Sequence, residues 1–197
     1  SGKSSAMRLG VMCSGNGTNF ENIVRTCRHD EVVVMVHNKK KCGAARRAVK
    51  FGIPHTHLDS KNENLIIDVM RAWKVDLIVL AGWMRIVTPK LINAFPERII
   101  NLHPSLLPKY KGLRAIERAL ASGDEYTGVT VHYVNEELDS GKIIIQDKVP
   151  ILHNDDIKSL TKAIQRKEYA LLPQAIENVK HKLQKSDHRH LLSHNIN

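Results

Sequence analysis

The chain has 197 residues, of which 42% are hydrophobic and 25% are charged, a composition that fits one globular domain with a substantial core. It has no apolar run of roughly 18 residues and no secretory signal pattern, so we expect a soluble, cytoplasmic protein that does not enter a membrane. The three cysteines have no C-x-x-C spacing, which argues against a disulfide framework or a zinc site.

The net charge of +10 is the most unusual property of the composition. A basic protein can bind nucleic acid, a membrane surface or a small phosphorylated molecule. The basic residues gather at positions 39–41, 46–50 and 180–185, and no aromatic residues interleave with them as they do in proteins that bind single-stranded nucleic acid. We therefore interpret the charge as solvated surface that also steers an anionic substrate, with nucleic acid disfavoured as a partner.

The first predicted strand, residues 9–13, leads directly into a glycine-rich turn at 14–19 and then an amphipathic helix pattern through 20–27. Glycines in such a turn let backbone N–H groups point at an anion near the start of the helix. The turn lacks the Gly-Lys-Ser/Thr of a Walker motif, and Phe20 replaces the third glycine of the dinucleotide fingerprint. We expect a single phosphate here; a strand–helix turn without a ligand is the alternative.

Strands and helices then alternate along the chain. Strands are predicted at 32–36, in a short piece at 53–58 and at 77–80, with helices at 44–51 and at 65–73, the latter capped by Asp59 or Ser60. This alternation predicts an α/β fold, a Rossmann-like, doubly wound and mostly parallel sheet. Ligands bind such sheets at the carboxyl ends of the strands.

The segment 81–87 is too apolar for an ordinary loop, and Thr88-Pro89 after it predicts a helix N-cap with proline at the first helical position. Exposed Trp83, Met84 and Ile86 at the end of a strand would suit a flat aromatic ligand. The alternative is that these side chains cover the core.

Residues 99–103 form a short apolar strand that Pro104 ends. Because side chains alternate along a strand, Asn101 and His103 project from the same face. An amide beside an imidazole can stabilise an oxyanion. The alternative is that Asn101 caps a turn and His103 is a buried histidine with satisfied hydrogen bonds.

A helix over 115–121 and two strands at 127–134 and 143–149 follow, and the strands predict a C-terminal β-hairpin appended to the sheet. His132 and Asp139 lie in this hairpin. A carboxylate at the hairpin turn can orient His103 or raise its pKa, although Asp-Ser-Gly is also ordinary turn chemistry.

A long C-terminal helix, capped by Asp155 or Asp156, is expected to kink or split at Pro173. We expect residues 1–7 to be a tag remnant or disordered start, 8–183 a single domain and 184–197 a frayed polar tail. The tail histidines at 188, 190 and 194 have no cysteine or carboxylate cluster beside them, so no metal site is predicted.

Four segments carry a resemblance to a known family. They are residues 14–19 (SGNGTN), 80–85 (LAGWMR), 101–108 (NLHPSLLP) and 137–141 (ELDSG). Together they resemble the folate-dependent formyltransferases, and the N-terminal glycine turn is similar to the branch that acts on glycinamide ribonucleotide. The likeness runs from about residue 8 to about residue 182.

The resemblance implies transfer of the formyl group of 10-formyltetrahydrofolate to the amine of glycinamide ribonucleotide in purine (IMP) biosynthesis, without a metal. The amine would attack directly, and the tetrahedral oxyanion would meet Asn101 and a His103 that Asp139 keeps protonated. By the same resemblance the residues fall into four groups: catalytic Asn101, His103 and Asp139; phosphate-binding Gly17, Thr18 and Asn19; Glu168 for the ribose or amine end; and folate-binding Lys61, Met84, Arg85, Ile86, Val87, Asn101, Asn135, Glu136, Glu137, Leu138 and Asp139.

The chain departs from the family pattern at four positions. Lys61 stands for a more usual arginine, Trp83 for phenylalanine, Lys111 for proline and Arg114 for histidine. Trp83 would narrow the folate entry, and the two loop changes leave the mobility of residues 108–125 open. The rival functions are a formyltetrahydrofolate deformylase, a methionyl-tRNA formyltransferase and a non-enzymatic phosphate- or RNA-binding module. A monomer and a homodimer are both compatible with the sequence.

Overall fold

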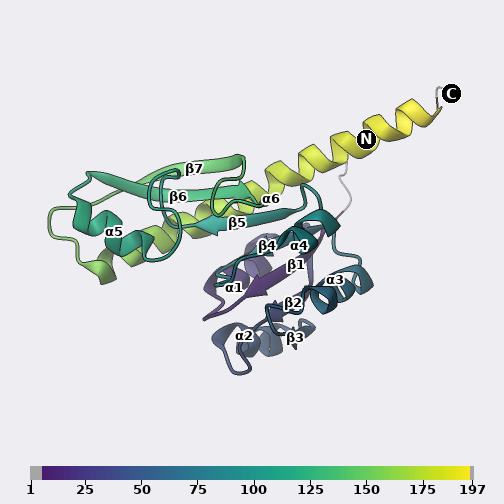
Figure 1. Ribbon diagram of the computed structural model, residues 1–197, viewed down its shortest axis with the longest axis horizontal. Coiled ribbons are helices and arrows are strands. Elements are labelled where there is room, and N and C mark those ends of the chain that lie inside the picture. Colours follow the sequence, from purple (N-terminus) through teal and green to yellow (C-terminus); the bar gives the residue numbers. More distant parts are fainter. Residues whose placement is uncertain (1–5, 196–197) are drawn as a thin grey trace.

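A computed structural model describes residues 6–195, without the side chains of residues 190 and 193–195 (Figure 1). Most of the start predicted to be a tag remnant, and the last two residues of the tail, lie outside the described part. The elements are β1 Arg8–Cys13, α1 Thr18–Thr26, β2 Glu31–His37, α2 Gly43–Phe51, β3 His55–His57, α3 Glu63–Ala72, β4 Leu77–Leu80, α4 Pro89–Ala94, β5 Ile99–His103, α5 Ala115–Ser122, β6 Tyr126–Tyr133, β7 Ile143–Pro150 and α6 Ile157–Asn195.

The strands form one seven-stranded sheet in the order β3-β2-β1-β4-β5-β6-β7. The first five strands in this order pair in parallel, whereas β6 pairs antiparallel with β5 and forms an antiparallel hairpin with β7 at the edge. This confirms the predicted α/β fold, with its mostly parallel sheet, appended hairpin and long C-terminal helix.

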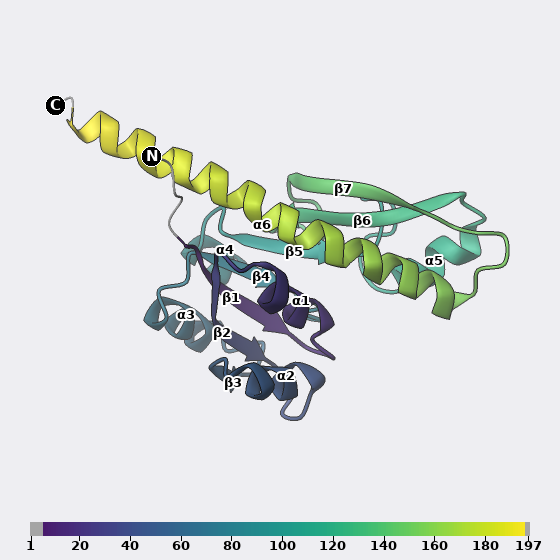
Figure 2. The ribbon, with the colours of Figure 1, turned by 180° about the vertical axis from the view of Figure 1, so that it is seen from behind.

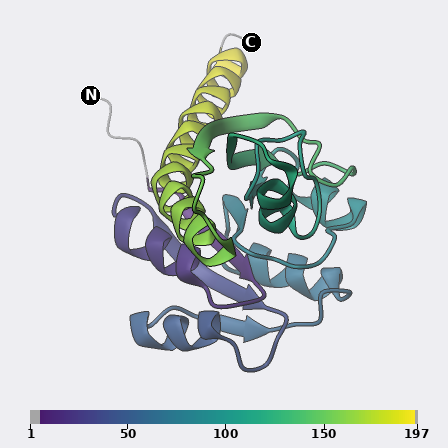
Figure 3. The same cartoon turned by 90° about the vertical axis from the view of Figure 1, so that its left-hand side faces the viewer.

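Two hydrophobic clusters cover the two faces of the sheet because strand side chains alternate. Val11 joins the cluster that α1, α2 and α6 complete, and its neighbour Met12 joins the cluster under α3 and α4. All four residues of β4 are buried, as expected for a strand covered on both faces. Figures 2 and 3 show α6 lying along the hairpin on one side and beside α1 on the other.

Two helix starts differ from the sequence-based expectation. The cap of α3 is Asn62, whose side chain accepts a hydrogen bond from the Leu65 N–H at 3.3 Å, and Asp59 instead accepts from the Lys61 N–H in the preceding turn. Thr88 precedes Pro89 at the start of α4 as predicted, but its side chain does not cap the helix. A carboxylate from elsewhere in the fold takes that role, which local sequence cannot reveal.

α6 is one helix from Ile157 to Asn195, so of the two expected effects of Pro173 the split is wrong, and the kink stays a prediction. Proline removes one backbone hydrogen bond from a helix. Residues on either side of it, Leu172 and Ile176 among them, are buried in the core, and this packing keeps the helix continuous. The start is as predicted, because Asp156 accepts a hydrogen bond from the Ser159 N–H at 2.8 Å.

Beyond Leu183, α6 extends away from the sheet (Figure 1). The structure gives this tail a helical conformation to Asn195; fraying of its exposed end in solution stays a prediction. Within residues 6–195, no helix is both long and apolar enough to span a membrane.

Candidate active site

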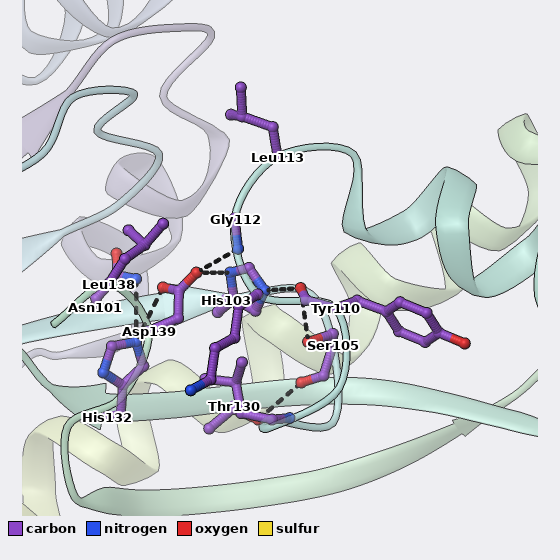
Figure 4. A network of polar contacts seen from close by, with 12 residues as sticks. Asn101, His103, Ser105, Tyr110, Gly112, Leu113, Thr130, His132, Leu138 and Asp139 are labelled. Atoms are coloured by element: carbon purple, nitrogen blue, oxygen red, sulfur yellow. Dashed lines mark hydrogen bonds and ion pairs between the residues drawn. The ribbon is translucent and has the colours of Figure 1, made fainter.

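β5 brings Asn101 and His103 to one face, and its pairing with β6 places His132 directly opposite Asn101. Asp139 reaches the same place from the turn between β6 and β7. Figure 4 shows the four side chains pointing toward one another. The structure thus brings together the three residues expected to be catalytic and adds His132.

His103 is 6% exposed and makes contacts through both ring nitrogens. Its Nε2 lies 2.7 Å from the Tyr110 carbonyl oxygen, and its Nδ1 lies 3.5 Å from Asp139 Oδ2. Because a carbonyl can only accept, Nε2 carries the proton of the neutral ring, and Nδ1 offers a lone pair on the side of the carboxylate. Asp139 Oδ2 also accepts a hydrogen bond from the Gly112 N–H at 2.7 Å.

The protonation state of His103 differs from the expectation. Burial lowers the pKa of His103 below its ordinary value and outweighs the Tyr110 carbonyl and Asp139, which both act to raise that pKa. Burial acts to raise the pKa of Asp139, yet contacts with His132, the Gly112 N–H and His103 lower it overall. At neutral pH the site therefore holds a neutral imidazole next to an ionised carboxylate, because the desolvation of His103 is stronger than its attraction to Asp139.

His132 holds the amide of Asn101. Its Nδ1 lies 2.8 Å from the Tyr133 carbonyl oxygen and so carries a proton, while Nε2 lies 3.2 Å from Asn101 Nδ2 and 3.6 Å from Asp139 Oδ1. With the proton on Nδ1, His132 offers Nε2 as the acceptor of a hydrogen bond from the amide of Asn101. The sequence pointed to His132 only as a polar residue in the hairpin, because its place opposite Asn101 depends on the strand register.

A further set of polar residues braces the loop after β5. The Thr130 hydroxyl donates to the Ser105 carbonyl at 2.7 Å, the Ser105 hydroxyl donates to the Lys109 carbonyl at 2.6 Å, and Gln146 Nε2 donates to the Leu107 carbonyl at 3.0 Å. These contacts place the Tyr110 carbonyl and the Gly112 N–H against His103 and Asp139, two of the residues expected to be catalytic. The sequence analysis did not predict these supporting residues. The only sign of them in the sequence is that polar residues recur at alternate positions of β6 and β7.

The predicted phosphate turn lies at the carboxyl end of β1. Gly17 precedes α1 with φ of 76°, and a Cβ there would come within 2.6 Å of Ala44 Cα, so this position requires glycine. Thr18 and Asn19 open α1, where free N–H groups and the helix dipole favour an anion. The side chain of Asn19 turns away, with Nδ2 3.4 Å from Glu168 Oε1.

Glu168 on α6 is therefore adjacent to the phosphate turn, as expected for a residue at the substrate's ribose or amine end. Burial raises the pKa of Glu168 to about 7, and the contact with Asn19 only partly opposes this. The Asn19 Oδ1 atom is buried and has no hydrogen-bond partner among the described residues. A carboxyl group and a free amide oxygen thus stand together beside the turn.

The segment expected to bind folate after β4 divides into two sets of side chains. Met84 and Ile86 are 59% and 71% exposed, and Arg85 between them is exposed as well, whereas Trp83 and Val87 pack into the core. The expectation that Trp83 is exposed and narrows the folate entry is therefore wrong, since its ring fills the core below α3 and α4. Val87 can offer a ligand only its backbone.

The remaining residues expected to bind folate lie at exposed turns. Lys61 is exposed just before α3, and the turn after β6 exposes Asn135, Glu136, Glu137 and Leu138 while burying Asp139. Leu113, 72% exposed in the loop before α5, is a further apolar side chain at this edge that the sequence did not single out.

The two family departures in the loop before α5 have structural roles. Lys111 Nζ donates to Ser140 Oγ at 2.9 Å, which ties the loop to the turn that carries Asp139. Arg114 adopts a φ of 57° and stands at the N-cap position of α5. A cavity of about 380 Å³ near Arg8 and Trp73 lies around the starts of β1 and β2, away from these residues.

The fold and the site define a class of protein. Residues 7–176 match the family model described as formyl transferase, and the chain belongs to this family.

Its relatives define the branch. The chain is 39% identical to the phosphoribosylglycinamide formyltransferase of Haemophilus influenzae over 86% of this chain and 85% of that protein. Two solved structures of phosphoribosylglycinamide formyltransferases are also similar. The structure from Bacillus halodurans has 37% identity and a TM-score of 0.82 over 89% of this chain and 94% of that one. The structure from Anaplasma phagocytophilum has 35% identity and a TM-score of 0.87 over 90% and 88%.

Proposed function

We propose that the protein transfers the formyl group of 10-formyltetrahydrofolate to the amine of glycinamide ribonucleotide, in de novo purine biosynthesis. The observation that carries the proposal is the buried pair of His103 and Asp139 beside the amide of Asn101, at the carboxyl edge of the sheet. The similarity to phosphoribosylglycinamide formyltransferases over most of both chains supports the choice of substrates.

In the proposed reaction the amine nitrogen attacks the formyl carbon, and the carbonyl electrons move to the oxygen. The amide of Asn101 donates a hydrogen bond to this oxyanion. Neutral His103 takes the proton that the amine loses and returns it to N10 of the folate as the C–N10 bond breaks, so no net proton is gained or lost. Asp139 stabilises the imidazolium while it lasts. Because positioning and proton transfer suffice, the transfer requires neither a metal nor a covalent nucleophile.

The substrate sites follow from the same edge of the sheet. The phosphate of the ribonucleotide lies on the N–H groups of Gly17, Thr18 and Asn19, and Glu168 accepts hydrogen bonds from the ribose or amine end. The folate lies between two exposed segments, Met84 to Ile86 on one side and Asn135 to Leu138 on the other, with Lys61 near its entry. Exposed Met84, Ile86 and Leu138 fit an aromatic ring, and the exposed cations Arg85 and Lys61 fit the carboxylates that it carries.

We further propose that the protein works in the cytoplasm as a monomer or homodimer. Free Cys13, Cys27 and Cys42 fit a reducing compartment.

The test is an assay of folate release from 10-formyltetrahydrofolate, with and without glycinamide ribonucleotide. Release that depends on the ribonucleotide supports the proposal, whereas release that ignores it indicates a deformylase. Formyl transfer to methionyl-tRNA would indicate a methionyl-tRNA formyltransferase. Salt-dependent RNA binding without any formyl transfer would indicate a non-enzymatic binding module.

The first prediction concerns His103. His103→Ala removes the proton carrier, so we expect kcat to fall by about a hundredfold or more while the fold is retained. Activity and thermal unfolding are measured together on the variant and the wild type. A folded variant with near-normal turnover contradicts the assignment.

A further inference from the structure

The loop 82–88, between β4 and α4, is held at its start by Ser14. The Ser14 N–H donates to the Gly82 carbonyl at 2.9 Å, and the Met84 N–H donates to Ser14 Oγ at 2.9 Å. Ser14 is fully buried and is the first residue of the phosphate turn. One side chain therefore joins the segment beside the ribonucleotide to the segment beside the folate.

The end of the same loop is held by Glu63, the first residue of α3. Its carboxylate is 5% exposed and accepts three hydrogen bonds, from the Thr88 N–H at 2.9 Å, the Thr88 hydroxyl and the Leu91 N–H at 3.3 Å. These donors stand at the N-terminus of α4, where a negative charge is favoured. Glu63 supplies the cap that Thr88 does not.

Between these two anchors the loop buries its flanking side chains and exposes the three at its centre, Met84, Arg85 and Ile86. Trp83 and Val87, each 8% exposed, are fixed in the core, while Met84 and Ile86 face outward. A loop fastened in this way presents its exposed residues in one backbone conformation, so the loop itself loses less conformational freedom when a ligand binds.

We propose that Ser14 and Glu63 are positioning residues for the folate side of the site, and that Ser14 also couples the folate loop to the phosphate turn. Neither residue contacts a reacting atom in the proposed reaction, and each acts through the backbone of the loop 82–88. The inference rests on the proposed function only for the identity of the ligands.

Glu63→Gln tests the anchor at the end of the loop. An amide can accept fewer of the three hydrogen bonds and turns its own N–H groups toward donors, so the loop loses part of its cap. We expect KM for 10-formyltetrahydrofolate to rise about tenfold, with kcat and KM for the ribonucleotide within about twofold of the wild type. An unchanged folate KM, or a loss in kcat alone, overturns the role of Glu63.

Ser14→Ala tests the coupling. The methyl group cannot accept from the Met84 N–H, and the change lies on the phosphate turn itself, so we expect KM to rise for both substrates. In the wild type, bound ribonucleotide is expected to tighten the binding of tetrahydrofolate, and Ser14→Ala is expected to reduce that effect. If only the folate KM rises in Ser14→Ala, and bound ribonucleotide still tightens the binding of tetrahydrofolate, then Ser14 does not couple the folate loop to the phosphate turn.

Asp156→Asn is the matched control. Asp156 is also a carboxylate that caps a helix, but it lies at the start of α6 and is exposed, so all kinetic constants should stay at wild-type values. Amide hydrogen exchange of the loop 82–88 and titration with tetrahydrofolate are measured for every variant, and both are expected to show a looser loop and weaker folate binding in Glu63→Gln. These measurements need no turnover, so they remain decisive if the wild type transfers no formyl group, a result that would contradict only the proposed function.

Discussion

At the scale of single residues, the surroundings of His103 favour an imidazole that is neutral in the free protein and cationic only during proton transfer. The Tyr110 carbonyl fixes the proton on Nε2, and burial disfavours a second proton. Asp139 nevertheless lies 3.5 Å from Nδ1, so a proton that arrives there finds a carboxylate to stabilise it. In the proposed reaction His103 both takes and returns a proton, and this balance suits that role better than a permanent charge.

Asp139→Asn tests that balance directly. Asp139 acts to raise the pKa of His103 against the effect of burial, so we expect the pKa of His103 to fall further in the variant. Turnover should drop by about a hundredfold, because the imidazolium loses its partner. The titration of His103 is followed by NMR in both proteins. A higher pKa in the variant would show that Asp139 does not favour the cation.

Glu168 leads to a prediction about pH. Its pKa of about 7 means that the carboxyl group of the free protein is neutral below pH 7 and ionised above it. Only the ionised form can accept hydrogen bonds with both oxygens, so kcat/KM for the ribonucleotide should fall by about tenfold per unit as the pH drops below 7. Glu168→Gln is expected to lower kcat/KM and to remove the fall that begins near pH 7, leaving only the fall at lower pH where His103 becomes protonated. Persistence of the fall near pH 7 in the variant would assign it to another group.

At the scale of elements, periodicity predicted most of the fold because each strand and helix carries its own pattern. Apolar runs, alternating patterns and turn residues predicted six of the strands and the short extended piece that contains β3. The alternation of side chains along a strand also placed Asn101 beside His103 without any tertiary information. His132 could not be placed in the same way, because it meets Asn101 only through the register of β5 with β6. The protonation of His103, the burial of Trp83 and the cap that Glu63 provides all depend on packing between distant segments, which a local pattern does not encode.

The role of Gly17 in the turn after β1 can be tested by substitution. Gly17→Ala introduces a Cβ at a positive φ and within 2.6 Å of Ala44 Cα, so the turn must shift away from α2. We expect the protein to lose about 1–3 kcal/mol of stability and KM for the ribonucleotide to rise more than KM for the folate. Denaturant unfolding and steady-state kinetics provide the two measurements. Gly52→Ala is the control, because Gly52 also has a positive φ but has open space around its Cβ position and lies away from the site. Equal kinetic effects in both variants would count against a phosphate role for the turn.

At the scale of the whole molecule, α6 joins the two halves of the protein, since it packs on the β6–β7 hairpin and on α1 (Figures 2 and 3). It also carries Glu168 to the phosphate turn, where the Asn22 side chain donates to the Tyr169 carbonyl at 3.0 Å. Under the proposed function, the position of this one helix therefore decides whether Glu168 can reach a substrate bound at the N-terminal turn.

The buried pair of Lys180 and Asp30 fixes that position. Lys180 Nζ lies 2.8 Å from Asp30 Oδ1, the two side chains are 2% and 3% exposed, and Asp30 also accepts from the Met7 N–H just before β1. Lys180→Met keeps most of the apolar side-chain volume but leaves Asp30 buried without its cation, so we expect a loss of about 3–5 kcal/mol in unfolding free energy. Lys185→Met, an exposed change on the same helix, should cost less than about 0.5 kcal/mol. Glu168 lies three helical turns before Lys180 on the same helix. In folded Lys180→Met we therefore expect kcat to stay near its wild-type value and KM for the ribonucleotide to rise more than KM for the folate. Equal stability of the two variants would mean that packing alone holds α6 in place.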